Sequence, residues 1–473
     1  MNLDRNEIFL AGEWVTPQAT SAIEVENPAT EEVIATVPAG SAADVDRAVR
    51  AAQQAFPAWA ATSGQERAKG LRRLHEALAR RASAIAETVT TEVGTPMRIA
   101  TRIQTDQPIA MLAAFADIAE QEPEPERIGN SVIVREAAGV VGAITPWNYP
   151  LHQLVCKLAP ALAAGCTVVL KPSEIAPLSA YLLFEAIVEA GLPAGTVNLV
   201  PGMGPEAGEA LARHPDVDLV SFTGSVAAGA RVAELAAPTI KRVTLELGGK
   251  SANVILDDAD LKTAVKVGVA NAFLNGGQTC NAWTRMLVPA ARHDEALDLA
   301  AGFAAGYVPG DPLDPATKLG PLVSGRQRER VRTFIRAGID EGARLVTGGA
   351  DAPGKPARGY YVSPTVFGDV NPDGVLAQEE IFGPVLSLIP HGGDAEAVAI
   401  ANNSRYGLHG AVWSADPDRA LAVARRLRTG SVDVNGGAYN PLAPAGGYKQ
   451  SGVGRELGRY GMQEFCEIKS IQL

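Results

Sequence analysis

The sequence has few of the residues that build disulfide scaffolds and metal sites. It contains four cysteines, none of them in a CxxC pair, and six scattered histidines with no HExxH spacing. A chain of this size does not need disulfides to be stable, and zinc sites require clustered Cys and His ligands. We therefore expect no disulfide framework and no metal site, and a reducing, cytoplasmic location.

Basic runs and long apolar runs are also missing. The formal net charge is −11, whereas nucleic acids and anionic membranes are bound through basic patches. The first residues contain no apolar signal segment, so we expect no secretory signal. The longest charge-free apolar stretch, 158–170, is too short to span a bilayer and contains Pro160 and Gly165. Neither nucleic acid nor membrane is an expected partner.

At 473 residues, the chain is long enough for two or three domains. From Gly139 onward, apolar strands alternate with amphipathic helices. Strands are predicted at 140–144, 167–170, 197–200, 219–222 and 242–246, and helices at about 154–164, 178–190 and 226–235. This alternation is typical of a parallel, doubly wound α/β sheet, in which ligands bind beyond the carboxyl ends of the strands.

The flanking regions differ from this core. Residues 8–37 are predicted to form short strands and turns, and 42–120 to be helical. The acidic, proline-broken piece 120–126 predicts a boundary, followed by a strand pair at 131–135. A second α/β segment extends from about 247 to 447, with strands at 382–389 and 410–414. The tail, 464–471, alternates apolar and polar residues and predicts a strand that needs a partner, for instance in another subunit.

One cysteine stands in a position suited to chemistry. Cys280 follows the glycine-rich turn that contains Gly276 and Gly277, and Glu246 is a candidate base. A nucleophilic cysteine needs a base and room for a substrate, and glycines let the backbone approach a ligand closely. The alternative is that Cys280 is a small buried hydrophobic residue, which is the commonest state of a free cysteine.

Two polar clusters are candidates for binding a nucleotide, although there is no GxGxxG motif. Residues 222–225, followed by Gly229, place glycine and serine at a helix N-terminus, where backbone N–H groups favour phosphate. The alternative is a simple serine cap. Lys171 and Glu174 follow the second strand of the sheet, where an acidic residue commonly binds ribose hydroxyls. The alternative for Glu174 is a solvated helix start.

A series of segments, taken together, resembles the aldehyde dehydrogenase superfamily over essentially the whole chain. These segments are 145–150, 171–174, 222–225, 246–250, 277–280, 379–384 and 446–452. The resemblance implies an aldehyde dehydrogenase-like α/β fold with a Rossmann-type doubly wound sheet. The implied parts are an NAD-binding domain (1–121 and 138–246), a catalytic α/β domain (247–446) and a small β oligomerisation arm (122–137 and 447–473).

The resemblance also implies the reaction, which is NAD(P)-dependent oxidation of an aldehyde to the carboxylic acid. The Cys280 thiolate would attack the aldehyde, and the Asn148 amide and the Cys280 backbone N–H would hold the oxyanion. After hydride transfer, Glu246 would activate water to hydrolyse the thioester. Lys157 and Glu456 match positions of a proton relay from Glu246, and the alternative for them is an ordinary ion pair.

NAD is the implied cofactor, because Glu174 would repel a 2′-phosphate; NADP is the alternative. Lys171 and Glu174 would lie at the adenine-side ribose, Trp147 and Ser225 at the pyrophosphate, and Glu379 at the nicotinamide ribose. The full set of implied cofactor contacts is Ile144, Thr145, Pro146, Trp147, Lys171, Ser173, Glu174, Gly204, Gly208, Phe222, Thr223, Gly224, Ser225, Leu247, Gly248, Glu379 and Phe382.

The substrate tunnel differs from that of many relatives, which have Pro-Phe-Gly-Gly where this chain has 444–447, with Ala445 in place of the phenylalanine. Loss of a phenyl ring frees space. We therefore predict a roomier tunnel, lined also by Tyr149, Asn281, Tyr439 and Asn440, for a bulky, aromatic or long-chain aldehyde or semialdehyde. The alternative is that Trp283 or Tyr439 fills the gap.

Two rival functions are a CoA-acylating dehydrogenase and a structural protein that keeps the fold without catalysis. The acylating branch usually lacks the carboxylate of the Glu246 motif, and a structural protein does not need Cys280, Glu246 and Asn148. Members of the superfamily are usually homodimers or homotetramers, in which the C-terminal strand and a hairpin near 122–137 pair across subunits. We expect a homodimer or homotetramer here.

Overall fold

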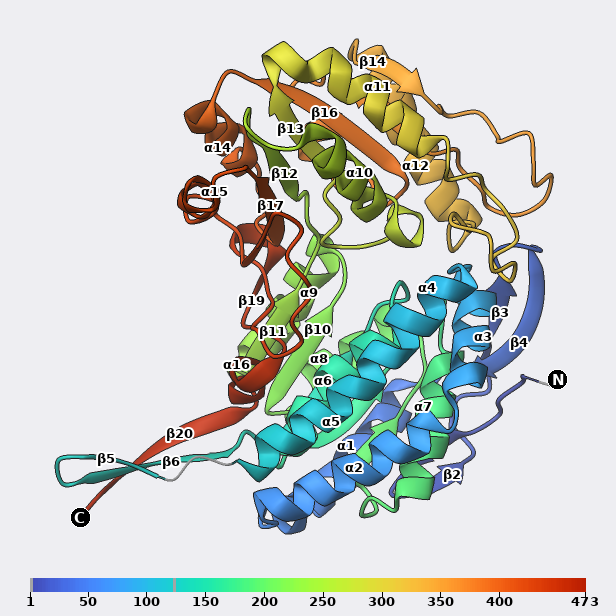
Figure 1. Cartoon of the computed structure of the whole chain (residues 1–473). Helices are drawn as coiled ribbons and strands as arrows, with labels where there is room; N and C mark the ends of the chain where they lie inside the picture. The colour runs from blue at the N-terminus through green and yellow to red at the C-terminus, as the bar shows by residue number, and fades with distance from the viewer. Residues whose placement is uncertain (1–2, 122–124) are drawn as a thin grey trace.

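The computed structural model describes residues 3–121 and 125–473 and has two lobes and a projecting arm (Figure 1). The lower lobe, called the first lobe below, contains an eight-stranded sheet. The upper lobe, called the second lobe below, contains a seven-stranded sheet. A three-stranded sheet forms the arm, which carries the C-terminus. The α/β fold class is confirmed.

The eight-stranded sheet has the order β19-β11-β10-β7-β8-β9-β1-β2. Its five central strands are parallel, as predicted, and the edge strands β1, β2 and β19 pair antiparallel. The strands are β1 (Ile8–Leu10), β2 (Glu13–Val15), β7 (Val140–Ile144), β8 (Thr167–Lys171), β9 (Val197–Leu199), β10 (Leu219–Thr223), β11 (Arg242–Glu246) and β19 (Gly452–Val453).

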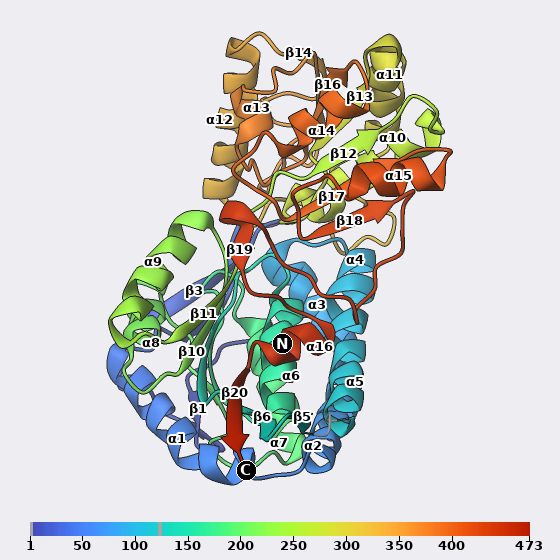
Figure 2. The ribbon, with the colours of Figure 1, turned by 90° about the vertical axis from the view of Figure 1, so that its left-hand side faces the viewer.

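Helices cover both faces of this sheet (Figure 2). Val141 and Ala143 of β7 pack into one core, and Val140 and Ile144 into the other, because alternate side chains of a strand point to opposite faces. One face carries α1 (Ala42–Ala60), α8 (Glu209–Arg213) and α9 (Val226–Ala236). The other carries α2 (Gly64–Ala79), α3 (Ala82–Val93), α5 (Gln107–Glu120), α6 (Pro150–Ala164) and α7 (Leu178–Ala190), with α4 (Met97–Thr101) and η1 (Arg102–Asp106) leading into α5.

The seven-stranded sheet has the order β14-β15-β16-β13-β12-β17-β18 and is parallel except for the β14–β15 pair. Its strands are β12 (Ala252–Ile255), β13 (Arg285–Pro289), β14 (Arg344–Thr347), β15 (Thr365–Gly368), β16 (Val385–His391), β17 (His409–Trp413) and β18 (Ser431–Val434). Its helices are α10 (Leu261–Ala272), α11 (His293–Ala304), α12 (Gly325–Asp340), α13 (Val375–Gln378), α14 (Asp394–Asn402) and α15 (Pro417–Ala424).

The strand predicted at 382–389 begins later than expected. Phe382 adopts a left-handed conformation (φ 62°), and the strand starts at Val385, directly after Pro384. A positive φ breaks the extended backbone, and proline has no N–H to donate to a ladder. Residues 382–384 are therefore a loop, which is free to reach toward the first lobe.

The arm consists of β5 (Glu126–Ile128), β6 (Ser131–Ala137) and β20 (Cys466–Gln472), with β20 antiparallel to β6. The range 447–473, assigned to the arm from the sequence, is divided in the structure. Its first part returns to the lower lobe: β19 pairs with β11, and α16 (Gly458–Gln463) packs against α5 and α6. Residues 122–124 of the predicted arm lie outside the described residues.

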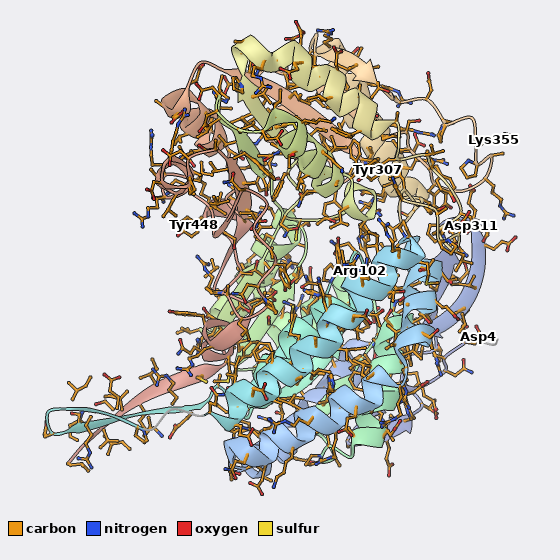
Figure 3. All side chains as sticks on the ribbon, in the orientation of Figure 1. Asp4, Arg102, Tyr307, Asp311, Lys355 and Tyr448 are labelled. Atoms are coloured by element: carbon orange, nitrogen blue, oxygen red, sulfur yellow. The ribbon has the colours of Figure 1, made fainter. Side chains whose placement is uncertain are left out.

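A single connecting segment leads from the upper lobe back to the lower one, and Tyr448 lies on it (Figure 3). The Tyr448 ring packs beneath the guanidinium groups of Arg428 and Arg455. On the opposite side, the hairpin of β3 (Ala22–Asn27) and β4 (Glu32–Pro38) lies beside α3 of the lower lobe (Figure 1). Its tip reaches the upper lobe, where the Tyr360 N–H donates to the Pro28 carbonyl (3.0 Å). Among the described residues, no helix has the length and apolar character needed to cross a membrane.

Candidate active site

The order of the parallel strands creates a crevice at the carboxyl end of β7. From β7 the chain moves to β8 and β9 on one side, and β10 and β11 lie on the other side. The connections after β7 and β10 therefore diverge, and ligands of open α/β sheets bind at such a switch point. A cavity of about 520 Å³ lies there, lined by Pro146, Trp147, Asn148, Gln153, Ile175, Thr223, Gly224, Ser225, Glu246, Leu247, Gly248, Cys280, Val323, Ser324, Arg326, Gln327, Arg330, Glu380 and Phe382.

A turn of unusual backbone conformation carries Cys280 into this cavity. Asn275, Gly276 and Gly277, in η4 (Leu274–Gly277), have φ values of 52°, 66° and 73°. Glycine adopts this left-handed region without a steric cost. A Cβ at Gly277 would lie 2.1 Å from the backbone oxygen of Gly383, so a side chain has no room there. The predicted glycine-rich turn is present, and its glycines are required by geometry.

Residues of the first lobe hold the turn in place. The Asn148 side-chain amide donates to the Gln278 carbonyl (2.9 Å), and the Asn275 amide donates to the Asn148 carbonyl (2.9 Å). The Tyr149 hydroxyl lies 2.7 Å from Thr279 Oγ1. An amide nitrogen has two N–H groups. Asn148, which lines the cavity, is therefore fixed beside Cys280 and retains one donor.

Glu246 ends strand β11 and lines the same cavity. Its Oε1 atom is buried and has no hydrogen-bond partner among the described residues. A Cβ at Gly446 would lie 2.7 Å from this oxygen, so glycine leaves the space beside it open. Burial raises the pKa of Glu246 well above its usual range, and Glu456 raises it further, while Lys157 opposes both. The carboxyl group is thus poised to exchange a proton with water.

Lys157 and Glu456 form a nearly buried ion pair, with 2.8 Å between Nζ and Oε1. Lys157 also donates to Ser221 Oγ on β10 (3.2 Å). The backbone of Glu456 is held by two hydrogen bonds with Ala445, of 2.9 Å and 2.8 Å. The pair lies close enough to Glu246 to shift its pKa, so the geometry is compatible with both interpretations, relay and ion pair.

Cys280 itself is held as a thiol in this site. Burial raises the pKa of Cys280 to about 12, and the carboxylates of Glu380, Glu246 and Glu456 act in the same direction. A thiol must lose its proton to act as a nucleophile. Either a base or a positive charge beside the sulfur is therefore needed for reaction at neutral pH.

Several predicted cofactor residues line the cavity, on both of its walls. From the first lobe come Pro146, Trp147, Thr223, Gly224, Ser225, Leu247 and Gly248, and from the second comes Phe382. The Trp147 and Phe382 rings meet edge to face across the lobes, with centroids 5.5 Å apart. The Thr223 hydroxyl is buried without a partner among the described residues, and Ser225 caps α9. An unpaired hydroxyl next to a helix N-terminus suits the phosphates and riboses of a dinucleotide.

Besides Glu246, the acidic residue that lines the cavity is Glu380, whereas Glu379, which was predicted to contact the cofactor, is not in the lining. Glu380 accepts a hydrogen bond from the Gly249 N–H (3.0 Å), and burial raises its pKa to about 7. Glu379 instead pairs with Arg405 (2.7 Å) outside the lining. Glu379 has an extended backbone, in which successive side chains point to opposite sides, so only one of the two can face the cavity.

The predicted adenosine-side residues lie beside the lined cavity. The Lys171 ammonium group pairs with Glu174 (3.0 Å), and Ser173 Oγ accepts from the N–H of Ile175, which is in the lining. A Cβ added at Gly208, in η2 (Gly204–Gly208), would lie 3.8 Å from Lys171 Cδ, so Gly208 stands beside that side chain. Ile144 is buried at the end of β7. These residues cluster at the carboxyl ends of β7 and β8.

Comparison with known proteins decides the family. The sequence model of the aldehyde dehydrogenase family matches residues 14–471. The chain belongs to the aldehyde dehydrogenase family. It is an NAD(P)-dependent oxidoreductase that oxidises aldehydes or semialdehydes, and the two rival functions are not favoured.

Individual relatives agree with this assignment. The chain is 51% identical to 3-succinoylsemialdehyde-pyridine dehydrogenase of Pseudomonas sp. (99% of this chain, 98% of the relative) and 45% identical to geranial dehydrogenase of Castellaniella defragrans (100% of both). Aldehyde dehydrogenase C of Pseudomonas syringae, crystallised with NAD+ and octanal, is similar with a TM-score of 0.98 and 48% identity (99% and 96% covered). A Mycobacterium tuberculosis aldehyde dehydrogenase complexed with NAD+ has a TM-score of 0.97 and 42% identity (100% and 99% covered). These complexes support NAD as the cofactor.

The residues predicted for the aldehyde tunnel do not line the cavity described above. Tyr149 is buried, and its hydroxyl contacts Thr279 in the turn before Cys280. Asn281, Tyr439 and Asn440 are exposed. Ala445 is half-buried and bonded to Glu456. The Trp283 indole is buried in the core of the second lobe and donates to His409 Nδ1 (2.9 Å). The roomier tunnel, and the alternative in which Trp283 or Tyr439 fills the gap, stay predictions.

Other lining residues of this aldehyde dehydrogenase were not predicted from the sequence. They are Gln153, Ile175, Val323, Ser324, Arg326, Gln327, Arg330 and Glu380. The segment 324–330 forms the N-terminal end of α12, where Gln327 donates to the Phe382 carbonyl (2.8 Å) and Arg330 to the Glu380 carbonyl (2.9 Å). In the sequence, the available signal for this part of the lining was Ser324, which caps a helix, followed by the strongly basic start of α12.

Proposed function

We propose that this enzyme oxidises bulky aldehydes and semialdehydes to carboxylic acids with Cys280 as nucleophile and water as the final acyl acceptor. The observation that carries the proposal is the convergence of Cys280, Asn148 and Glu246 on one cavity at the switch point of the sheet. The relatives named for 3-succinoylsemialdehyde-pyridine and geranial support a substrate larger than a short-chain aldehyde.

Cys280 attacks the aldehyde carbon once its proton has been removed. The free N–H of the Asn148 amide and the Cys280 backbone N–H stabilise the oxyanion that forms. The chemistry that bound NAD would supply is that of a positively charged hydride acceptor. Trp147, Thr223 and Ser225 on one wall and Glu380 and Phe382 on the other are the residues that would hold it.

Glu246 removes a proton from the water that hydrolyses the thioester. Its unpaired Oε1 atom and the space that Gly446 leaves beside it suit this role. The raised pKa makes Glu246 a stronger base when ionised. Lys157 and Glu456 pass the proton away from Glu246, and the buried ion pair holds them in line for that transfer.

The sheet of β7–β11 is the NAD-binding domain in this proposal, and the sheet of β12–β18 is the catalytic domain. The Glu174 carboxylate, paired with Lys171 at the end of β8, disfavours a 2′-phosphate and so favours NAD over NADP. Ile144, Thr145, Ser173, Gly204 and Gly208 complete the adenosine side.

The arm is the proposed contact between subunits. β20 is an edge strand of its sheet, and Ile468 and Leu473 expose 69% and 72% of their surface. An exposed apolar edge strand is a template for pairing with another chain, so we propose a homodimer or homotetramer. A cytoplasmic location is part of the same proposal, supported by four free cysteines.

The test is NADH formation from a bulky aldehyde, followed by absorbance. Replacing Cys280 by Ala should abolish NADH formation without changing the circular dichroism spectrum. Glu246→Gln should leave a burst of one NADH for each active site and lower the steady-state rate by about 100-fold or more, because loss of a general base affects only hydrolysis. A strict requirement for CoA, or a Cys280→Ala variant as active as the wild type, would contradict the proposal.

A further inference from the structure

The two lobes meet not only along the segment that connects them but also at the tip of the β3–β4 hairpin (Figure 1). This hairpin packs in the core of the first lobe. The second-lobe loop 358–360 binds its tip through backbone groups. The Gly359 N–H donates to the Glu31 carboxylate (2.8 Å), and the Tyr360 N–H donates to the Pro28 carbonyl (3.0 Å). The loop therefore fastens the second lobe to the hairpin.

Tyr360 also binds the hairpin through its side chain. The half-buried hydroxyl donates a hydrogen bond to Oε1 of Glu26, which lies on β3. Burial raises the pKa of Tyr360 to about 12, and the bond to Glu26 acts in the same direction. The hydroxyl therefore keeps its proton at physiological pH and remains a donor. A hydrogen bond to a carboxylate is stronger than one between neutral groups, so this contact is a firm link between the lobes.

The same tyrosine packs against the start of α12 in the second lobe. The Arg328 guanidinium stands over the Tyr360 ring, 5.3 Å from its centroid. A Cβ added at Gly325, the first residue of α12, would lie 3.2 Å from a ring carbon of Tyr360. The Tyr360 carbonyl accepts from the Leu322 N–H (3.0 Å), shortly before the helix begins. Tyr360 thus contacts the hairpin of the first lobe and the start of α12 at once.

The start of α12 in turn holds the loop that lines the cavity. Gln327 donates to the Phe382 carbonyl (2.8 Å), and Arg330 donates to the Glu380 carbonyl (2.9 Å). Glu380 and Phe382 are the second-lobe residues that would hold NAD. A chain of direct contacts therefore leads from the hairpin through Tyr360 and α12 to the wall that would face the cofactor.

We propose that Tyr360 is a positioning residue for NAD: its bond to Glu26 fixes the start of α12, and with it Glu380 and Phe382, at the spacing from the first lobe that binds the cofactor. Tyr360 is not in the lining of the cavity, so it acts through α12 and not by touching the cofactor. A site that is ordered before its ligand arrives loses less conformational freedom on binding, so the link raises the affinity for NAD. The inference rests on the proposed function, in which NAD lies between the two walls.

The test is Tyr360→Phe, which removes the bond to Glu26 and keeps the ring beneath Arg328. The dissociation constant of NADH, measured by its fluorescence on binding, should rise about fivefold, and KM for NAD should rise by the same factor. At saturating NAD, kcat and KM for the aldehyde should change by less than about twofold, because Cys280 and its neighbours are untouched. A merely structural role would lower the thermal stability without this selective loss of cofactor affinity.

Tyr361→Phe is the matched control, because the adjacent Tyr361 hydroxyl donates to the Gly310 carbonyl (3.1 Å) inside the second lobe. It should change the NADH dissociation constant by less than about twofold. Glu26→Ala should weaken NADH binding as Tyr360→Phe does, and the double variant should bind no more weakly than either single one, because both changes remove the same bond.

An unchanged NADH dissociation constant in Tyr360→Phe, or an equal rise in Tyr361→Phe, overturns the inference and leaves the proposed function intact. Absence of NADH formation by the wild type from any bulky aldehyde would overturn the proposed function, whereas the binding measurement would still decide the role of Tyr360. Should Tyr360→Phe fail to fold, the same constant is measured in Glu26→Ala, and an unchanged value there again overturns the inference.

Discussion

The two walls of the cavity hold their functional side chains by different means. On the second-lobe wall, the backbone does the holding: three successive left-handed residues and tight contact with Gly383 position Cys280. On the first-lobe wall, Asn148 follows one regular parallel strand and Glu246 ends another, and the Asn148 side chain is fixed by its hydrogen bond to the Gln278 carbonyl. The first wall is a standard α/β sheet edge, and the second is a specific turn.

This difference bears on where the enzyme tolerates change. A strand end is supported by its whole sheet, so a small steric conflict there can be relieved by rotation of a side chain. The turn that carries Cys280 is confined by backbone atoms of Gly383, and these atoms cannot move without disturbing a packed core. The second wall should therefore be far more sensitive to a single added methyl group than the first.

Gly277→Ala compared with Gly224→Ala tests this contrast most strongly. At Gly277 the new Cβ would stand 2.1 Å from the Gly383 carbonyl oxygen, at a φ of 73°. At Gly224 the nearest atoms to the new Cβ would belong to the Phe222 ring, the closest at 2.5 Å. Gly277→Ala should lower kcat by about 100-fold, because displacement of a nucleophile by 1 Å has effects of that size. Gly224→Ala should retain most of kcat.

Steady-state kinetics with one bulky aldehyde measures both variants, and circular dichroism checks that each has folded. Equal losses of kcat in the two variants would mean that the walls are equally constrained. The comparison between a backbone-held and a side-chain-held wall would then be wrong.

The electrostatics of the second wall are tested by alkylation of Cys280 with iodoacetamide. Because the pKa of Cys280 is raised to about 12, the thiol is protonated at neutral pH. Its alkylation rate should rise about tenfold for each pH unit between 7 and 9, as the thiolate fraction rises. The peptide that contains Cys280 is quantified by mass spectrometry, with Cys280→Ala as the control. A rate that levels off by pH 8 would contradict the raised pKa.

Two adjacent glutamates, Glu379 and Glu380, provide the test of the second wall with the smallest expected effect. Glu380 lies in the cavity, and Glu379 pairs with Arg405 outside it. Glu380→Gln should raise KM for NAD by about fivefold, the size expected from loss of one charge-assisted hydrogen bond. Glu379→Gln, its matched control, should change KM for NAD by less than about twofold, since exposed ion pairs contribute little. The reverse order would show that the cavity assignment is wrong.

Prediction from sequence was accurate for the regular elements of the first lobe. The strands at 140–144 and 242–246 and the helix at 178–190 have the predicted bounds. Each is a short apolar or amphipathic run bounded by a turn or a glycine, such as Gly191 after α7, so local pattern and burial agree. The helical region from Ala42 to Glu120 is likewise confirmed, divided into several helices.

Prediction was weaker where distant segments meet. Residues 452–453 carry no strand signal, and β19 forms only because β11 offers an open edge beside it. Gln153 resembles any polar residue of a helix until the fold places it in the lining of the cavity that contains Cys280. The role of Ala445 in the tunnel stays a prediction, and the backbone hydrogen bonds by which Ala445 supports Glu456 were not predicted. In each case the deciding contact comes from residues far away in the chain.

The sequence by itself pointed to a candidate nucleophile and a candidate base, and it determined the parallel sheet and the aldehyde dehydrogenase resemblance, because each is written in contiguous residues. Only the tertiary structure decided that Glu380 and not Glu379 lines the cavity, that α12 forms its second wall, and that the Gln153 amide oxygen has no partner among the described residues. Adjacent residues of an extended segment point in opposite directions, and only the surrounding packing selects which of them is buried.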